Sequence, residues 1–331
     1  MPSAAPPLDL DEAQAWVDEA LVRCGLARTG PAEVHLDRPW STVWRLPLGE
    51  SACWLKANTS TCAYEGAVLR LLAEAELPHV LRPWAIDLDR GLLLSADHGP
   101  TLREWRGVAR AVDAHERLLA SYADLQRRTE RLVPALLRAG VPDHRTAELA
   151  AHRERLIAEC AAAAGPARLS AAGAARLRGH TDAYASWCAE LEAFGIAATL
   201  QHNDLHDANA FPTLDQAGRL VDVVVFDFGD SVVGHPFTSL LVALRSAAHH
   251  LDLAPESPGL TRLRDAYLEP WTAEHTRADL DRAVELAVRV GTVSRADAWH
   301  RALIGSRPRA VAEFADAVPG WVLEELGSPV L

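Results

Sequence analysis

The segment at residues 200–211 (LQHNDLHDANAF) carries two histidines, two aspartates and two asparagines within eight positions, between apolar residues. A hydrophobic run at 220–228 (LVDVVVFDF) follows, and it leads into Asp227-Phe228-Gly229-Asp230. This run predicts a buried strand that is reached through a turn at 213–218. The strand delivers a carboxylate at its end, and Gly229 permits a sharp turn directly after it. The fold must therefore hold two polar clusters at defined positions.

Two chemistries are compatible with the first cluster. His and Asp are common zinc ligands, and His-x-Asp-x-His-Asp resembles the first ligand cluster of metallo-hydrolases. Such sites need further ligands later in the chain, where the histidines are His235, His249 and His250. The more organised downstream feature is the motif at 227–230, and it favours the second chemistry, which is phosphoryl transfer.

Phosphoryl transfer needs a base for the hydroxyl proton, oxygen ligands for Mg²⁺ and a cation on the phosphates. Asp204 and Asn209 have the Asp-x-x-x-x-Asn spacing of a kinase catalytic loop, and Asp227 provides a second acidic position. Lys56 lies on a strand-like segment, and Glu65 follows nine residues later in a predicted helix. The order of these residues is that of a kinase.

Lysine usage adds a second observation, because Lys56 is the only lysine and every other one of the 33 basic residues is arginine. Either the single lysine is chance, or it stands where arginine cannot replace it.

Composition excludes several classes of partner. The net charge of −12 argues against nucleic acid or an anionic membrane, and it weakly favours a cationic or neutral partner. Five cysteines form no CxxC pair, which predicts neither a disulfide framework nor a structural zinc site and fits a reducing cytoplasm. No export signal and no apolar window of about 18 residues is present, so we expect a cytoplasmic protein without a membrane anchor.

Hydrophobic periodicity divides the chain into two lobes. Up to residue 96 it predicts a helix at 11–26, a hairpin at 42–56, a helix capped by Ser60 or Thr61, and a second hairpin at 85–94. Residues 101–198 are mostly helical, with interruptions near 140–142 and 164–166, and the Ala-rich piece at 158–178 is either a loosely packed helix or a flexible segment. Residues 236–331 are again helical. We predict an α+β fold with lobes at 1–96 and 97–331.

The two motifs together resemble the aminoglycoside phosphotransferase and choline kinase branch of the protein-kinase-like fold. His202-x-Asp204-x-His206-x-x-Asn209, followed by the motif at 227–230, matches that family's His-Gly-Asp-Leu-His-x-x-Asn loop and its metal-binding aspartate. The second histidine separates this pattern from ordinary protein kinases. About 35–245 follows the family's order of elements, and the resemblance implies a bilobal fold with a small nucleotide-binding lobe and a helical substrate-binding region at 101–198.

Carried over to this chain, the resemblance makes Asp204 the catalytic base and Asn209 and Asp227 the Mg²⁺ ligands. It makes Lys56 a phosphate-binding residue and Glu65 its partner. His202 braces the loop, and His206 either gives similar support or lies near the substrate.

Further nucleotide contacts follow only from the order of elements. Without a glycine-rich loop, Ser41 and Thr42 would contact the phosphates through hydroxyls or backbone amides, unless they form a plain turn. Ser95, Ala96 and Asp97 fall where the family's linker binds adenine through its backbone. After the metal aspartate many relatives have Gly-Asp-Pro and then Asp-Leu, whereas His235 and Ser239 replace both acids here, which puts the acceptor in doubt.

The resulting hypothesis is a kinase that transfers phosphate from ATP or GTP, with Mg²⁺, to a small-molecule hydroxyl. Acidic residues of the helical region suit an amine-bearing acceptor, unless they belong to solvated helix faces: Asp113, Glu116 and Asp124. A kinase of peptide or natural-product hydroxyls and a nucleotide-binding pseudokinase remain alternatives. The sequence selects neither the acceptor nor the oligomeric state.

Overall fold

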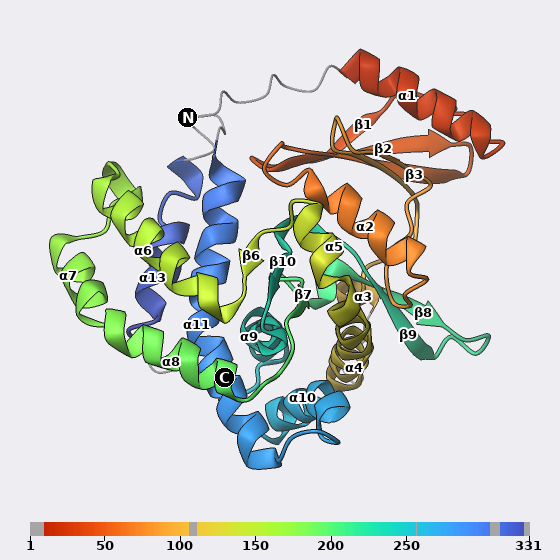
Figure 1. Cartoon of the computed structure of the whole chain (residues 1–331). Coiled ribbons are helices and arrows are strands. Elements are labelled where there is room, and N and C mark those ends of the chain that lie inside the picture. Colours follow the sequence, from red (N-terminus) through yellow and green to blue (C-terminus); the bar gives the residue numbers. More distant parts are fainter. Residues whose placement is uncertain (1–9, 106–110, 256, 305–311, 328–331) are drawn as a thin grey trace.

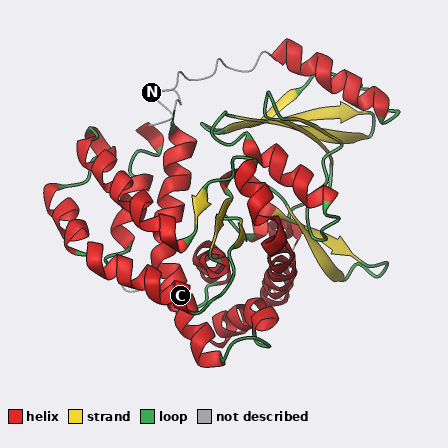
Figure 2. Cartoon of the chain, in the orientation of Figure 1, coloured by secondary structure: helices red, strands yellow, loops and turns green. Residues whose placement is uncertain are grey.

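A computed structural model of the chain describes residues 10–105, 111–255, 257–304 and 312–327. It has a smaller lobe built on an antiparallel sheet and a larger, mainly helical lobe (Figure 1). Figure 2 shows that the longest strands lie in the smaller lobe and most of the helices lie in the larger one. The predicted α+β bilobal class is confirmed.

The sheet of the smaller lobe has five antiparallel strands in the order β1-β2-β3-β5-β4. Their bounds are β1 (Glu33–Asp37), β2 (Ser41–Leu48), β3 (Ser51–Asn58), β4 (Ala85–Asp87) and β5 (Leu92–Ala96). The turn between β2 and β3 contains Gly49, whose φ of +77° is a conformation that glycine adopts without strain. This hairpin carries Lys56 on its second strand, in register with Val43 on the first.

One helix packs on each face of this sheet (Figure 1). α1 (Leu10–Arg23) buries Val17 and Leu21 in one cluster with Leu55 of β3. α2 (Tyr64–Glu74) approaches β4 closely at Gly66, where an added Cβ would lie 2.9 Å from a methyl carbon of Ile86. Its other apolar residues join the core of the larger lobe: Val68, Leu69 and Leu72. α2 therefore connects the sheet to the larger lobe.

Within the described residues, ten α-helices belong to the larger lobe. They are α3 (Leu102–Trp105), α4 (Ala111–Thr129), α5 (Val133–Arg138), α6 (Thr146–Ala162), α7 (Ala171–Gly179), α8 (Thr181–Ala193), α9 (Leu240–Leu251), α10 (Pro258–Leu268), α11 (Arg277–Leu303) and α13 (Ala317–Glu324). α11 has 27 residues and contacts α6, α8, α9 and α13. It is buried along most of its length, so its polar residues are forced into interior contacts.

Short strands place the two polar clusters side by side. The larger lobe has β6 (Asp143–His144), β7 (Thr199–Gln201), β8 (Ala210–Leu214), β9 (Leu220–Val225) and β10 (Val232–Gly234). The loop at 202–209 connects β7 to β8, and the motif at 227–230 connects β9 to β10. Ala210 pairs with Val225 across the β8–β9 hairpin, so the end of the first cluster lies beside the start of the second.

Several local predictions are confirmed, and others are wrong. Both hairpins form as expected, as does the helical character of the described parts of 101–198 and 236–331; residues 106–110, 256, 305–311 and 328–331 lie outside the description. The predicted cap of α2 is wrong, because the hydroxyls of Thr59 and Thr61 bond to each other and α2 begins at Tyr64. The Ala-rich piece is two helices separated at Gly165, and Val221 of β9 is exposed because the β8–β9 ribbon has only two strands.

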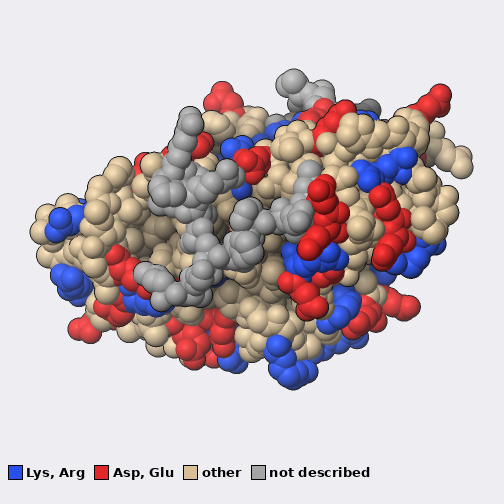
Figure 3. Space-filling model, turned by 90° about the horizontal axis from the view of Figure 1, so that it is seen from above, with Lys and Arg blue, Asp and Glu red and all other residues tan. Residues whose placement is uncertain are grey.

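No described helix is both long enough and apolar enough to cross a membrane. On the face seen in Figure 3, basic side chains are scattered among acidic ones and do not gather into one patch.

Candidate active site

Lys56, Asp204 and Asp227 line a single cavity of about 180 Å³, although they come from three separate segments. β3 supplies Lys56, the β7–β8 loop supplies Asp204, and the end of β9 leads to Asp227. The remaining lining residues are Trp40, Asn58, Cys62, Gly229, Asp230, Arg295, Ala298, Trp299 and Ala302. The structure thus brings together the central residues that the sequence predicts.

The Lys56 ammonium lies between two carboxylates. Its Nζ is 2.7 Å from Oε2 of Glu65 and 2.5 Å from Oδ1 of Asp227. Burial opposes the charged form, but the carboxylates of Asp227 and Glu65 raise the pKa of Lys56 above its ordinary value. Asn58 donates to the same Glu65 oxygen at 2.7 Å. The predicted lysine–glutamate pair is therefore formed.

Asp227 has a left-handed backbone conformation, with φ of +66° and ψ of +58°. Aspartate tolerates this region better than most residues, and the turn points the chain away from β9. The amide of Phe228 donates to Oε1 of Glu65 at 3.0 Å, which fixes the position after the turn. Burial opposes ionisation of Asp227, but Lys56 lowers its pKa below the ordinary value. Asp227 is therefore an anion at neutral pH.

His202 is an internal brace of the loop at 202–209. The ring is buried; its Nε2 donates to the carbonyl of Phe226 at 2.8 Å, and its Nδ1 accepts from the amide of Asp204 at 3.3 Å. Burial lowers the pKa of His202, so it holds these bonds as a neutral ring. The hydroxyl of Tyr122 accepts from the amide of His202. These contacts match the supporting role that the resemblance implies.

Asn209 and His206 complete the loop. Nδ2 of Asn209 donates to the carbonyl of Asp204 at 3.0 Å, so its amide oxygen stays available as an acceptor. Nδ1 of His206 accepts from the amide of Ala208 at 3.2 Å, and its Nε2 lies 3.6 Å from Oδ2 of Asp204. His206 thus both caps the loop and faces the carboxylate of Asp204.

The Asp204 carboxylate has a partner that sequence reasoning missed, Arg295 of α11. Nη2 of Arg295 lies 2.8 Å from Oδ1 of Asp204, and Nη1 lies 2.5 Å from Oδ2 of Asp230. Burial alone raises the pKa of Asp204, but Arg295, with His206, holds it well below its ordinary value. No local signal identifies this arginine, because the chain uses arginine almost everywhere and α11 is distant in sequence.

His235 and Ser239, which replace the two acids of the family pattern, make hydrogen bonds without a negative charge. Oε1 of Gln201 accepts from the hydroxyl of Ser239 at 2.7 Å and from the amide of Asn203 at 3.1 Å. Nδ1 of His235 accepts from the amide of Phe237 at 3.2 Å, and burial lowers the pKa of His235 to about 3. A neutral Gln201–Ser239 contact therefore holds the start of the catalytic loop.

The cavity lining does not include the five residues proposed from order alone. Ser41 is buried, and the hydroxyl of Thr42 donates to the Asp37 carboxylate at 3.0 Å, as in a plain turn. Ser95 and Ala96 end β5, and the carboxylate of Asp97 accepts from the amide of Gly99 at 2.9 Å. Trp40, the neighbour of Ser41, does line the cavity.

A divalent cation fits this donor set. Asp227 lines the cavity and offers a carboxylate, and Asn209, which does not line it, offers an amide oxygen from the adjoining loop; both are ligand types that Mg²⁺ prefers. The lining has three aspartates, Asp204, Asp227 and Asp230, against Lys56 and Arg295, so its charge favours a cation.

Zinc is not favoured at the loop. Among the described residues, the one set of three or more His, Cys, Asp or Glu ligand atoms that converges belongs to His144, His152 and Asp297, outside the loop. There, Asp297 already forms ion pairs with Arg155 and Arg301, and these cations would repel a metal ion.

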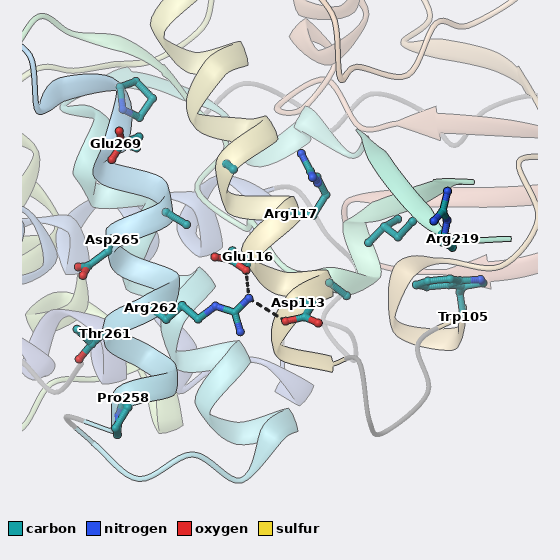
Figure 4. A pocket seen from close by; sticks show the side chains of 15 residues that line it. Trp105, Asp113, Glu116, Arg117, Arg219, Pro258, Thr261, Arg262, Asp265 and Glu269 are labelled. Carbon is teal, nitrogen blue, oxygen red and sulfur yellow. Dashed lines mark hydrogen bonds and ion pairs between the residues drawn. The ribbon is translucent and has the colours of Figure 1, made fainter. Parts of the chain in front are cut away.

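A second, larger groove of about 1310 Å³ lies between α4 and α10 (Figure 4). Asp113 and Glu116 line this groove and not the cavity at Asp204, and both form ion pairs with Arg262. Asp124 pairs with Arg128 at 2.8 Å. The acidic residues singled out for an amine-bearing acceptor are thus engaged with arginines.

Comparison with known proteins relates this architecture to phosphotransferases. No family model and no curated protein sequence matches the chain. Among solved structures, a Plasmodium vivax ethanolamine kinase is similar with a TM-score of 0.61 and 11% identity, over 88% of this chain and 81% of the kinase. The macrolide 2′-phosphotransferase of Brachybacterium faecium is similar with a TM-score of 0.53 and 19% identity, over 88% of this chain and 98% of that enzyme. A spectinomycin phosphotransferase in complex with ADP and spectinomycin is similar with a TM-score of 0.52 and 11% identity, over 95% of this chain and 98% of that enzyme.

The similarity spans both lobes, because it covers most of this chain and most of each neighbour. The chain therefore has the bilobal, protein-kinase-like fold of the choline/ethanolamine kinases and the antibiotic phosphotransferases.

Proposed function

We propose that the chain is a Mg²⁺-dependent kinase that transfers the γ-phosphate of ATP or GTP to a hydroxyl group of a small molecule. The observation that carries the proposal is the convergence of Lys56, Asp204 and Asp227 on one cavity. A phosphate-binding cation, a carboxylate for the acceptor and a carboxylate for the metal are the parts that phosphoryl transfer uses. The phosphotransferases among the structural neighbours support the same chemistry.

Each residue has one task in the proposed reaction. Lys56, oriented by Glu65, binds the phosphates, and Asn209 with Asp227 holds Mg²⁺, which neutralises phosphate charge when bound. The acceptor oxygen forms a bond to the γ-phosphorus, and the bond from that phosphorus to the β,γ-bridging oxygen breaks. The leaving ADP or GDP keeps the electron pair, and Asp204 takes the hydroxyl proton. Because the pKa of Asp204 is low, we expect this proton to move late, which suits a loose transition state.

Nucleotide and acceptor are proposed at a coarser level. We place the base near Ser95, Ala96 and Asp97 and the phosphates near Ser41 and Thr42, through backbone amides, since the Thr42 hydroxyl is engaged. The ADP in one neighbouring structure supports an adenine nucleotide. Ethanolamine kinase and spectinomycin phosphotransferase as neighbours make amine-bearing alcohols and antibiotics the first acceptors to test.

The test compares wild type with Asp204→Asn in the presence of Mg²⁺ and ATP or GTP. Wild type should turn over nucleotide faster with a suitable acceptor from a panel of ethanolamine, choline, macrolides, spectinomycin and aminoglycosides. Asp204→Asn should bind Mg·ADP as tightly as wild type and lose turnover by about 100-fold or more, because general-base catalysis and its electrostatics are removed. Equal turnover in the two proteins would contradict the assignment of Asp204, and a wild type that binds but never hydrolyses nucleotide would indicate a pseudokinase.

We also propose that the protein works in the cytoplasm. All five cysteines are free, and four of them are buried as thiols, which suits a reducing compartment. Burial raises the pKa of Cys62 at the cavity to about 11, so this thiol is unreactive at neutral pH.

A further inference from the structure

Arg295 is the second cation of the cavity. Among the described lining residues only Lys56 and Arg295 carry a positive charge. Lys56 is already bound to Glu65 and Asp227, whereas Arg295 is the cation in contact with Asp204. Arg295 is therefore the cavity cation in direct contact with the carboxylate at which we propose the acceptor binds.

The guanidinium is held in place without being saturated. The Arg295 residue is 9% exposed, and its contacts are Asp204, Asp230 and, at 3.4 Å, the carbonyl of Asn203. Arginine has five N–H donors, and within the described part of the chain Nη2 contacts Asp204 alone, which leaves one of its two N–H groups for a ligand. Its Cζ also lies 5.6 Å from the ring centre of Trp299, which lines the cavity. A buried, fixed and only partly paired guanidinium is well suited to bind an oxyanion.

We propose that Arg295 is a catalytic residue that binds an oxygen of the transferred phosphoryl group. With nucleotide bound, the guanidinium shares its donors between Asp204 and a γ-phosphate oxygen while Asp230 keeps it in position. It stabilises the charge on the phosphoryl oxygens as the bond to the β,γ-bridging oxygen breaks and the bond to the acceptor oxygen forms. This inference rests on the proposed kinase function and adds a group that the sequence motifs do not contain.

The test compares ligands with and without the γ-phosphate. We would measure the affinity of Mg·ADP, of the Mg complex of a non-hydrolysable ATP analogue, and of Mg·ADP with aluminium fluoride, together with thermal stability. The variants are Arg295→Gln, which removes the charge, and Arg295→Lys, which keeps it. Arg282→Gln is the matched control, since Arg282 lies on the same helix and forms exposed ion pairs with Glu190 and Glu285.

Arg295→Gln should weaken the binding of the ATP analogue and of Mg·ADP with aluminium fluoride by about tenfold or more, because a charged hydrogen bond to the γ-position is lost. Mg·ADP should bind within about twofold of wild type, since it lacks that group. Arg295→Lys should recover part of the loss, and Arg282→Gln should match wild type throughout.

The inference is overturned if Arg295→Gln weakens the binding of ADP and of the ATP analogue equally, or weakens the binding of neither, because the arginine would then only brace the loop. If Arg295→Gln does not fold, Arg295→Lys decides by the same ratio of ATP-analogue to ADP affinity. A wild type that binds none of the three ligands would instead overturn the proposed function, so the two failures are distinguishable.

Discussion

At the scale of single residues, the site depends on how burial and fixed charges set the ionisation of Asp204. A buried carboxylate is expected to take up a proton, since burial disfavours the charged form. Arg295 at 2.8 Å reverses that preference, and His206 adds to the effect. Asp204 is therefore ionised at neutral pH, and in the proposed reaction it acts mainly as a positioned acceptor for the hydroxyl.

Removal of Arg295 should move the acidic limb of the pH–activity profile to higher pH. In the proposed reaction Asp204 works as the anion, so activity should be lost as the pH falls through its pKa. In wild type that pKa lies well below 3.8, and loss of the guanidinium removes the largest of the influences that oppose burial, so the pKa should rise. Acceptor-dependent kcat/KM measured from about pH 4 to about pH 8 should therefore decline earlier in Arg295→Gln than in wild type. An unchanged acidic limb, equal to that of Arg282→Gln, would refute this account of Asp204.

Lys56→Arg tests whether the only lysine of the chain is replaceable. The lysine ammonium is compact and fits between the carboxylates of Glu65 and Asp227. A guanidinium is larger and planar, so it cannot take the same position in a cavity of about 180 Å³. We expect a folded protein with a thermal midpoint near that of wild type and a turnover reduced by about tenfold or more. Arg45→Lys on the neighbouring strand is the control for the change of side chain. Wild-type turnover in Lys56→Arg would make the single lysine a matter of chance.

The sequence indicated residues that lie together in the structure where the signal is local. Asp204 and Asn209 are five positions apart and Asp227 ends a hydrophobic strand, so spacing alone relates them. Lys56 and Glu65 are nine positions apart on adjacent elements. Arg295 could not be found in this way, because its contacts depend on the packing of α11 against the catalytic loop.

At the scale of elements, predictions follow the strength of the turn and burial signals. The β2–β3 hairpin was predictable because Gly49 separates two apolar runs. β1 was missed although its residues alternate between polar and apolar (EVHLD), because the run has only five residues and two apolar side chains. The start of α2 was misplaced because a hydroxyl that caps a helix and one that bonds a neighbouring hydroxyl look alike in sequence.

α11 carries two buried charged residues of the larger lobe, Arg295 and Asp297. Asp297 on this helix is 2% exposed, with Oδ1 2.6 Å from Arg155 of α6 and Oδ2 3.0 Å from Arg301. Nε2 of His144 in β6 lies 3.2 Å away. Arg301 also donates to the hydroxyl of Tyr64 in α2. Asp297 thus connects α6 and β6 to the helix that carries Arg295 and, through Arg301, to the helix that carries Glu65.

Asp297→Asn should lower stability and flatten its dependence on pH. Burial raises the pKa of Asp297, but His144 and the two arginines bring it below the ordinary 3.8. Its stabilising effect is therefore present above about pH 4 and is lost as the pH falls further, through the folded-state pKa. The variant should lose about 2–4 kcal/mol of unfolding free energy at pH 7, since the mostly buried Arg301 and the half-exposed Arg155 lose their buried anion. Because part of the stability is already lost at pH 7, acid should lower the unfolding free energy of the variant less than that of wild type.

Urea unfolding at a series of pH values measures both effects. Asp281→Asn is the control, because Asp281 lies on the same helix in an exposed pair with Arg277, and it should change the unfolding free energy by no more than about 0.5 kcal/mol. A decline in acid as steep in Asp297→Asn as in wild type would contradict the assignment.

At the scale of the whole molecule, the cavity lies at the joint of the two lobes, which means that residues of both lobes line it. The smaller lobe contributes Lys56 and Trp40, and the larger lobe contributes Asp204, Arg295 and Trp299. The ring centres of Trp40 and Trp299 are 5.5 Å apart, in an edge-to-face contact. Below them, the segment after α2 pairs with β9, where the amide of Leu81 donates to the carbonyl of Val225 at 2.9 Å. A ligand in the cavity therefore contacts both lobes at once.

Magnesium nucleotide should consequently stabilise the folded chain as one unit. A ligand that binds only the folded state adds about 2.7 kcal/mol at a concentration of 100 times its Kd, which raises the thermal midpoint by about 5 °C for a chain of this size. Excess EDTA should remove most of that shift, and so should Asp227→Asn, because the proposed metal ligand is lost. Asp215→Asn is the matched control, since Asp215 lies in the turn of the β8–β9 hairpin and its side chain bonds to Ala217 and Arg219 of that turn. Both lobes should shift together in calorimetry with Mg·ADP; a shift confined to one of two transitions, or one that survives in Asp227→Asn, would show that nucleotide does not bind at the joint.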